Sequence, residues 1–332
     1  MKTVIQQLTE AFGPSGYETE VTDLIKEMVE AYADEVRTDV LGNVIAIKKG
    51  SQEGRDVMFA AHTDEIGLVV TFIDDKGFLR FANVGGVSVS TLVGNRVRFA
   101  GGAIGVIYQE KGAWKDLTLD KLYIDIGAET KEEAQKMVRL GEFGIFHREF
   151  TDLGNRLIAK AMDDRIGCVV LIEALKKIQN PKNTLYFVFT AQEEVGLRGA
   201  RTAAYGIDPD LGIALDVTLT GDMPEAMRME VALGKGAAIK VKDSSLVVHP
   251  KVKDLLVQLA EENSIPYQME VLERGGTDAG AIHLTKAGVP SGAISIPTRY
   301  VHSPSEMVDI RDVQACVDLV VALAKVDLTG IC

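Results

Sequence analysis

Residue types that bind metals in proteins follow five apolar runs of this sequence. They are His62 after DVMFAA, Asp163 after LIAKAM, Glu193 and Glu194 after LYFVFTAQ, Asp216 after GIAL, and His302 after GAISIPTRYV. Functional groups in open α/β sheets collect past the carboxyl ends of the strands, so we expect these side chains to meet at one edge of a sheet. One such residue alone would be typical of a turn or cap, whereas the complete set indicates a shared site.

Two imidazoles combined with several carboxylates predict a two-metal centre. Zinc takes imidazole nitrogen and carboxylate oxygen ligands at about 2.0–2.2 Å. Five protein ligands are too many for one catalytic zinc that must keep an open position, but they suit two ions if one carboxylate bridges them. Paired ions about 3.5–4 Å apart are a known arrangement for hydrolysis, because they share and activate a water molecule.

The segment His62-Thr63-Asp64 adds a feature that supports a metal-binding histidine. Residues i and i+2 at a strand end point to the same side, so the Asp64 carboxylate is expected to accept a hydrogen bond from the unligated ring nitrogen of His62. Such a contact orients the imidazole and makes it a better ligand. The alternative is an ordinary turn aspartate.

The elements that must position these residues fall into three stretches, at about 1–66, 67–157 and 158–332. The first has helical spacing in VTDLIKEMVEAYA, an edge strand at 44–48 and the buried strand DVMFAA. The second is cut by Asp-Asp-Lys-Gly, Gly-Gly and Gly-Asn turns into short β-rich runs, with one helical segment, ETKEEAQKMV. The third alternates helices and strands, with helices expected at about 165–177, 199–205, 251–263, 278–284 and 311–325.

This alternation predicts an α/β fold with a mostly parallel or mixed central sheet flanked by helices. The β-rich middle stretch is best explained as a small β-barrel or sandwich inserted into that fold.

Composition indicates an ordinary acidic globular protein. The chain has 332 residues, 46% of them hydrophobic, and a net charge of −12. This charge argues against a nucleic-acid or anionic membrane partner. No stretch approaches the ~18 apolar residues of a membrane span, and the first residues lack the apolar run of a signal peptide. Three scattered cysteines form no disulfide framework, which favours a cytoplasmic location.

Six motifs carry a resemblance to a known family. They are AAHTDEIG, AMDDRIG, AQEEVGLRGA, ALDV, GGTDAG and YVHSPSE. In this order they resemble the self-compartmentalising metallo-aminopeptidases that form tetrahedral particles, whose members are labelled glutamyl aminopeptidase, deblocking aminopeptidase or cellulase M. The resemblance extends over nearly the whole chain.

The resemblance implies a role for each residue of the site. Asp163 would bridge two divalent ions, zinc or cobalt, with His62 and Asp216 completing one ion's ligands, Glu194 and His302 completing the other's, and Glu193 acting as general base on the bridging water. It also implies a cis peptide bond between Asp163 and Asp164.

Domain organisation and assembly follow from the same resemblance. Residues 1–66 and 158–332 would form a zinc-exopeptidase-like catalytic domain, and residues 67–157 an inserted dimerisation domain. Dimers would assemble into a tetrahedral homo-dodecamer that admits short peptides. The preferred N-terminal residue stays open, since acidic, aliphatic and broad specificities all occur on this scaffold.

Two other function classes remain to be weighed. Paired carboxylates also cleave sugars, so a glycoside hydrolase of the endoglucanase type is one alternative. Against it stand the two strand-end histidines, a single tryptophan and an aromatic content of 6%. A non-catalytic assembly protein on a peptidase scaffold is the other, and the complete ligand set argues against it.

The remaining candidate residues have weaker signals. Asp278 lies in a glycine-rich loop, where it would line the substrate pocket or cap a helix. His147, His249 and His283 follow no strand end and are interpreted as structural. Arg198 and Arg201 would contact an acidic substrate side chain or form local salt bridges, and the local role is favoured. Lys160 is interpreted as a local charge partner.

Overall fold

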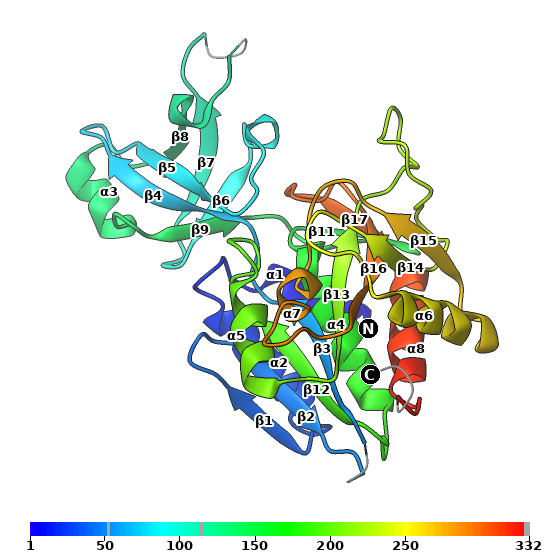
Figure 1. Ribbon diagram of the computed structural model, residues 1–332. Helices are drawn as coiled ribbons and strands as arrows, with labels where there is room; N and C mark the ends of the chain where they lie inside the picture. The colour runs from blue at the N-terminus through cyan, green and yellow to red at the C-terminus, as the bar shows by residue number, and fades with distance from the viewer. Residues whose placement is uncertain (52–53, 113–115, 329–332) are drawn as a thin grey trace.

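The computed structural model describes residues 1–51, 54–112 and 116–328. It contains a large mixed sheet flanked by helices and a small closed β-barrel, which forms a separate lobe at the upper left of Figure 1. The predicted fold class is therefore confirmed. Cys332 lies outside the described residues, whereas Cys168 and Cys316 are buried and free.

The large sheet has eleven strands in the order β1-β2-β12-β3-β13-β16-β17-β11-β10, with β14 pairing both β16 and β15. Their bounds are β1 (Glu35–Thr38), β2 (Val44–Lys48), β3 (Asp56–His62), β10 (Thr151–Leu153), β11 (Arg156–Ala159), β12 (Thr184–Thr190), β13 (Leu211–Thr218), β14 (Ala237–Lys242), β15 (Tyr267–Val271), β16 (Ser291–Arg299) and β17 (Glu306–Asp309). The segment 44–48 was predicted as an edge strand, and this is wrong, because β1 lies outside it.

Five strands of this sheet run in one direction. β12, β3, β13 and β16 are mutually parallel neighbours. β17 is antiparallel to β16, and β11 is antiparallel to β17, so β11 again runs the same way as β16. The carboxyl ends of all five strands therefore lie at one edge of the sheet.

Helices cover both faces of the sheet. Their bounds are α1 (Lys2–Glu10), α2 (Thr19–Val29), α4 (Met162–Lys177), α5 (Arg198–Ile207), α6 (Pro250–Glu262), α7 (Ala279–Ile282) and α8 (Ile310–Leu323). α1, α2, α4, α6 and α8 share one hydrophobic core, whereas α5 and α7 enclose a second one on the other face. On β3, Phe59 faces the first core and Met58 the second. Burial on both faces explains the continuous apolar run of β3.

The barrel closes in the order β4-β5-β8-β7-β6-β9 around its own hydrophobic core. Its elements are β4 (Gly67–Ile73), β5 (Leu79–Val84), η1 (Val89–Thr91), β6 (Arg96–Phe99), β7 (Ile104–Gln109), η3 (Leu119–Lys121), β8 (Leu122–Asp125), α3 (Lys131–Met137) and β9 (Phe143–Phe146). The strand β10 and the start of β11 also fall within residues 67–157, but they pair in the large sheet.

The stacked pair Phe59–Phe187 is the basis of a stability prediction. Both rings are fully buried, and their centroids lie 5.4 Å apart between β3 and β12. Phe187→Ala should lower the free energy of unfolding by about 3–5 kcal/mol, because it removes a buried ring and leaves a cavity. Denaturant unfolding at fixed metal and protein concentration measures the change.

Phe72→Ala on the barrel is the matched control, because that ring is 53% exposed. Its expected cost is about 1 kcal/mol or less. If both variants lose the same free energy of unfolding, the conclusion that the buried ring of Phe187 stabilises the core would be wrong.

Candidate metal centre

The predicted residues lie together at the carboxyl edge of the large sheet. His62 ends β3, and Asp163 lies at the start of α4, just after β11. Glu193 and Glu194 lie in the loop from β12 to α5, and His302 in the loop from β16 to β17. Asp216 differs slightly from the prediction, because it lies inside β13, which continues to Thr218.

Asp163 lies between the two histidines. Its Oδ1 is 3.0 Å from His62 Nε2, and its Oδ2 is 3.1 Å from His302 Nε2. On the His302 side, Glu194 Oε1 is 3.2 Å from the same ring nitrogen. Ligand atoms bound to one zinc ion lie roughly 3–3.5 Å apart, given bonds of about 2.0–2.2 Å. The two oxygens of Asp163 thus face two different groups of potential ligands.

Two groups of potential ligand atoms have members within 4.8 Å of one another. One contains His62, Asp163 and Glu194, and the other contains His62, Asp164 and Asp216. Asp164 was not among the predicted ligands. Its two oxygens already accept hydrogen bonds from the backbone N–H groups of His62 and Gly167, both at 3.1 Å.

The donor set fits divalent cations. The ion pairs that these carboxylates make within the described residues go to His62 and His302, with no lysine or arginine involved. Glu194 Oε1 is buried without a hydrogen bond, although it points toward His302. Buried carboxylates need a positive partner, and oxygen and imidazole ligands together suit zinc and similar ions.

The pKa values of these groups show where positive charge is stabilised. Burial alone would raise the pKa of Asp163, but hydrogen bonds from His302 and His62 hold it well below its ordinary value. Burial lowers the pKa of the His302 imidazole, but its contacts with Asp163 and Glu194 outweigh this effect and raise that pKa to about 12. Burial raises the pKa of Glu193 and of Asp216 well above the ordinary range. The site therefore favours cations strongly.

The orientation of His62 differs in detail from the prediction. Its Nδ1 lies 3.0 Å from the backbone carbonyl of Asp64 and 3.5 Å from the Asp64 carboxylate. That carboxylate also accepts hydrogen bonds from Ser15 Oγ at 2.5 Å and from the backbone N–H groups of Glu193 and Glu194 at 2.9 and 3.2 Å. Asp64 thus orients the histidine through its backbone and the glutamate pair through its side chain.

The adjacent glutamates point to different partners. Glu194 Oε1 approaches His302, whereas the nearest ring nitrogen to Glu193 Oε2 is His62 Nε2, at 3.8 Å. Next to them runs the loop that follows β5 of the barrel. A Cβ atom at Gly86 in this loop would lie 2.5 Å from His302 Nδ1, so the backbone approaches the site as closely as only glycine allows.

Glu306 was not predicted as part of the site. This residue is buried, and its carboxylate accepts hydrogen bonds from the backbone N–H of His302 at 2.7 Å and of Asp163 at 2.9 Å. It therefore connects two predicted ligands that are far apart in the sequence. Its position in the motif YVHSPSE, four residues after His302, was the available signal.

The residues with weaker signals lie outside the cluster. Asp278 precedes α7 without capping it, and its Oδ2 accepts a hydrogen bond from Thr190 Oγ1 at 2.5 Å. Burial raises the pKa of Asp278 to about 6. Lys160 forms a buried ion pair with Glu65 at 2.8 Å, in agreement with its interpretation as a charge partner. Arg198 donates to Gln192 Oε1, so its predicted local partner is an amide and not a carboxylate.

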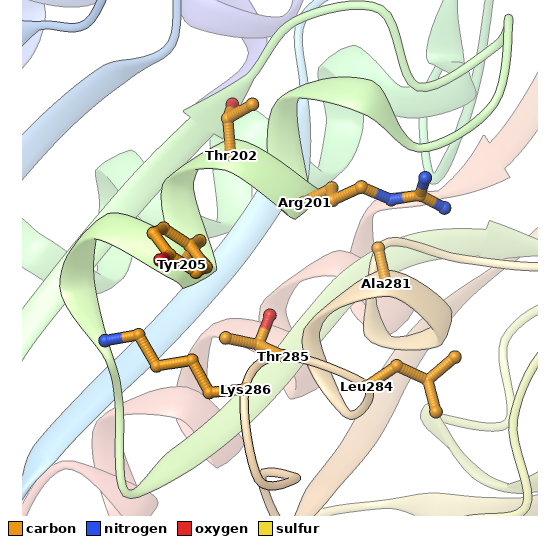
Figure 2. A pocket seen from close by; sticks show the side chains of 7 residues that line it. All are labelled: Arg201, Thr202, Tyr205, Ala281, Leu284, Thr285 and Lys286. Carbon is orange, nitrogen blue, oxygen red and sulfur yellow. The ribbon is translucent and has the colours of Figure 1, made fainter.

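A cavity of about 520 Å³ opens over the cluster. The lining includes His62, Asp163, Glu193, Glu194, Asp216 and His302, together with several apolar side chains and Arg274. A second cavity of about 460 Å³ lies between α5 and α7 (Figure 2) and is lined by Arg201, Tyr205 and Leu284 among others. Its lining includes neither histidine nor carboxylate side chains, so the predicted metal ligands line the first cavity and not this one.

Comparison with known proteins identifies the family. The profile of the M42 glutamyl aminopeptidases matches residues 42–319. The chain belongs to this family. A putative aminopeptidase of Acetivibrio thermocellus is 52% identical, with 97% of each chain covered. The lysyl aminopeptidase of Pyrococcus furiosus is 38% identical, with coverage of 97% of this chain and 96% of that protein. The chain is therefore a peptidase, and the aminopeptidase activity that its motifs imply is confirmed.

Solved structures support the same family. An aminopeptidase from the archaeon Desulfurococcus kamchatkensis superposes with a TM-score of 0.94 at 44% identity, covering 97% of this chain and 94% of that one. The TET1 peptidase of Pyrococcus horikoshii, which assembles into a tetrahedron or an octahedral shell, gives 0.87 at 34%, covering 97% and 98%. A Thermotoga maritima structure described as an endoglucanase gives a TM-score of 0.83 at 33% identity, covering 97% of this chain and 96% of that one. Within the described residues, none of the helices is long and apolar enough to cross a membrane.

Glu306 provides a test of how the site is positioned. In Glu306→Gln, an amide nitrogen would replace one carboxylate oxygen and would face the backbone N–H of His302 or Asp163. We expect the affinity for zinc to fall about 10–100-fold, as is typical when a group that orients a metal ligand is altered. Titration of the apoprotein with zinc against a competing chelator measures this affinity.

The control is Glu262→Gln on α6, whose carboxylate accepts a side-chain hydrogen bond from Gln258 at the surface. This variant should bind zinc as the wild type does. If Glu306→Gln also binds zinc as tightly as the wild type, Glu306 does not position the ligands.

Proposed function

We propose that this chain is a two-metal aminopeptidase that removes N-terminal residues from short peptides. The observation that carries the proposal is the position of Asp163, whose two oxygens face His62 on one side and His302 on the other, at 3.0 and 3.1 Å. A carboxylate in this position is suited to bridge two ions.

In this proposal the ligands divide between two zinc or cobalt ions. His62 and Asp216 would hold one ion, Glu194 and His302 the other, and Asp163 both. When bound, the ions would lower the pKa of the attacking water and polarise the scissile carbonyl. Asp64 and Glu306 hold the backbone around these ligands in place.

Glu193 is the general base of the proposed mechanism. Its carboxylate lines the cavity but lies farther from the ring nitrogens than its neighbour Glu194 does. Glu193 would take a proton from the attacking water and deliver it to the leaving amine, which is the ordinary task of a carboxylate next to a hydrolytic centre. The backbone N–H of Glu193 donates a hydrogen bond to the Asp64 carboxylate, and this bond holds Glu193 next to the cluster.

We extend the proposal to assembly by analogy with the Pyrococcus horikoshii peptidase, which forms closed shells. The barrel region would pair two chains, and dimers would build a homo-dodecamer that admits only short peptides. Strand β7 of the barrel supports this role, because Ile104, Val106 and Tyr108 expose an apolar row on its outer side. Exposed apolar rows of this kind are typical of interaction surfaces.

Single substitutions at the two glutamates separate their proposed roles. Glu193→Gln should retain both ions but lose nearly all turnover, about 10²–10⁴-fold or more, because the proton acceptor is removed. Glu194→Gln should instead bind metal more weakly, because a negatively charged ligand becomes neutral. Metal content by mass spectrometry and steady-state hydrolysis of a leucyl anilide distinguish the variants.

The two variants serve as controls for each other, because they make the same chemical change at adjacent positions. Wild-type turnover in Glu193→Gln would exclude it as the base. A Glu193→Gln protein that loses metal while Glu194→Gln keeps it would reverse the two assignments.

The second candidate function is cleavage of β-glucan, because the similar Thermotoga maritima structure is described as an endoglucanase. Chelation separates the two candidates. A metal chelator should abolish peptide hydrolysis, and zinc or cobalt should restore it, because the attacking water needs the ions. Cellulose hydrolysis that survives chelation would favour the glycoside hydrolase, which needs only two carboxyl groups.

A further inference from the structure

Arg274 lies on the wall of the cavity that contains the metal cluster. It belongs to the segment between β15 and α7, directly before Gly275 and Gly276. The lining alternates along this segment. Leu272 and Arg274 line the cluster's cavity, whereas Val271 and Glu273 line a separate groove next to it. The side chain of Arg274 therefore faces the proposed active site, and its acidic neighbour faces away.

The guanidinium of Arg274 has no hydrogen-bond or ion-pair partner within the described parts of the chain. Other arginines near the sheet are engaged. Arg156 and Arg299 pair with Asp309 and Asp222, and Arg165 makes several buried hydrogen bonds. A guanidinium presents donors in a planar fork that matches a carboxylate, so an unpaired one beside a reaction site is available for a ligand.

The charges around the cavity favour an anionic group at this position. Four carboxylates line it, those of Asp163, Glu193, Glu194 and Asp216. Two divalent ions would balance their four negative charges, which leaves Arg274 as the uncompensated charge. Apart from the two histidines, Thr218 and several glycines, the rest of the lining is apolar, with Leu197, Val217, Leu219, Leu272 and Val301. An occupant with apolar parts and one carboxylate is complementary to this lining.

We propose that Arg274 binds a carboxylate of the substrate peptide and determines specificity for it. This inference rests on the proposed function and adds the substrate class to it. The carboxylate has two possible sources with the same chemistry. It is either the side chain of an acidic N-terminal residue or the C-terminal carboxylate of a very short peptide.

The experiment compares Arg274→Met with the wild type, both loaded with zinc or cobalt, on four substrates. Glutamyl and leucyl p-nitroanilide differ in the acidic side chain and both lack a C-terminal carboxylate. Leu-Gly and Leu-Gly-amide differ only in the C-terminal carboxylate. Loss of one charge-assisted hydrogen bond corresponds to about a 10–100-fold change. We expect kcat/KM to fall by this factor, mainly through KM, on whichever carboxylate substrate Arg274 binds.

The pattern of losses identifies the source. A fall confined to the glutamyl anilide assigns the acidic side chain, and one confined to Leu-Gly assigns the C-terminal carboxylate. Leucyl anilide and Leu-Gly-amide should change less than about threefold. Arg274→Lys should recover part of the loss, because it keeps the charge without the planar fork.

Arg201→Met is the matched control, because Arg201 also lacks a partner within the described residues but lines the other cavity (Figure 2). It should leave all four substrates unchanged. Equal changes on all four substrates in Arg274→Met, or none, would overturn the role of Arg274 while leaving the proposed function standing. If the wild type hydrolyses no substrate, both the proposed function and this inference fall.

Discussion

The structure depends on how several buried carboxylates are stabilised at one edge of a sheet. Burying a charge without a partner is so unfavourable that each of these groups must find hydrogen bonds or a cation. They fall into two classes. Asp64, Asp164 and Glu306 accept two or more hydrogen bonds that include backbone N–H groups. Such hydrogen bonds stabilise the charge locally and fix the loops that carry them.

The second class faces the cavity and lacks comparable support. Within the described residues, Asp163 contacts the two imidazoles, Asp216 accepts a hydrogen bond only from the backbone N–H of Val217, and Glu194 Oε1 has no hydrogen bond. The hydrogen bonds thus distinguish carboxylates that hold the backbone from carboxylates that remain available for the proposed cations. They also explain why Asp164, although near His62 and Asp216, is better suited to hold the backbone than to bind an ion.

The fold class and the cluster could be predicted from the sequence because both depend on local patterns. Strands buried on both faces, such as β3, have continuous apolar runs, and their carboxyl ends meet by topology. β1 and β17 are short and were not predicted. β17 is nevertheless important, because it lies antiparallel between β16 and β11, so that β11 runs in the same direction as β16. Glu306 and Ser15 were not predicted because their contacts with Asp163 and Asp64 span 143 and 49 residues, although Glu306 also lies in the same motif as His302. Partners at such separations are set by tertiary packing, and no local pattern reports them.

An arginine that is close in sequence to the glutamate pair does not necessarily line the same cavity. Arg198 and Arg201 follow the glutamate pair closely, yet one donates to Gln192 and the other lines a different cavity. α5 begins at Arg198, so both side chains belong to the helix and not to the loop that carries the glutamates. Arg274 lines the cavity from a loop some eighty residues later, between β15 and α7. In a site built from strand ends, the proposed metal ligands follow directly on the strands, whereas the residue proposed to select the substrate comes from a loop that is distant in the sequence.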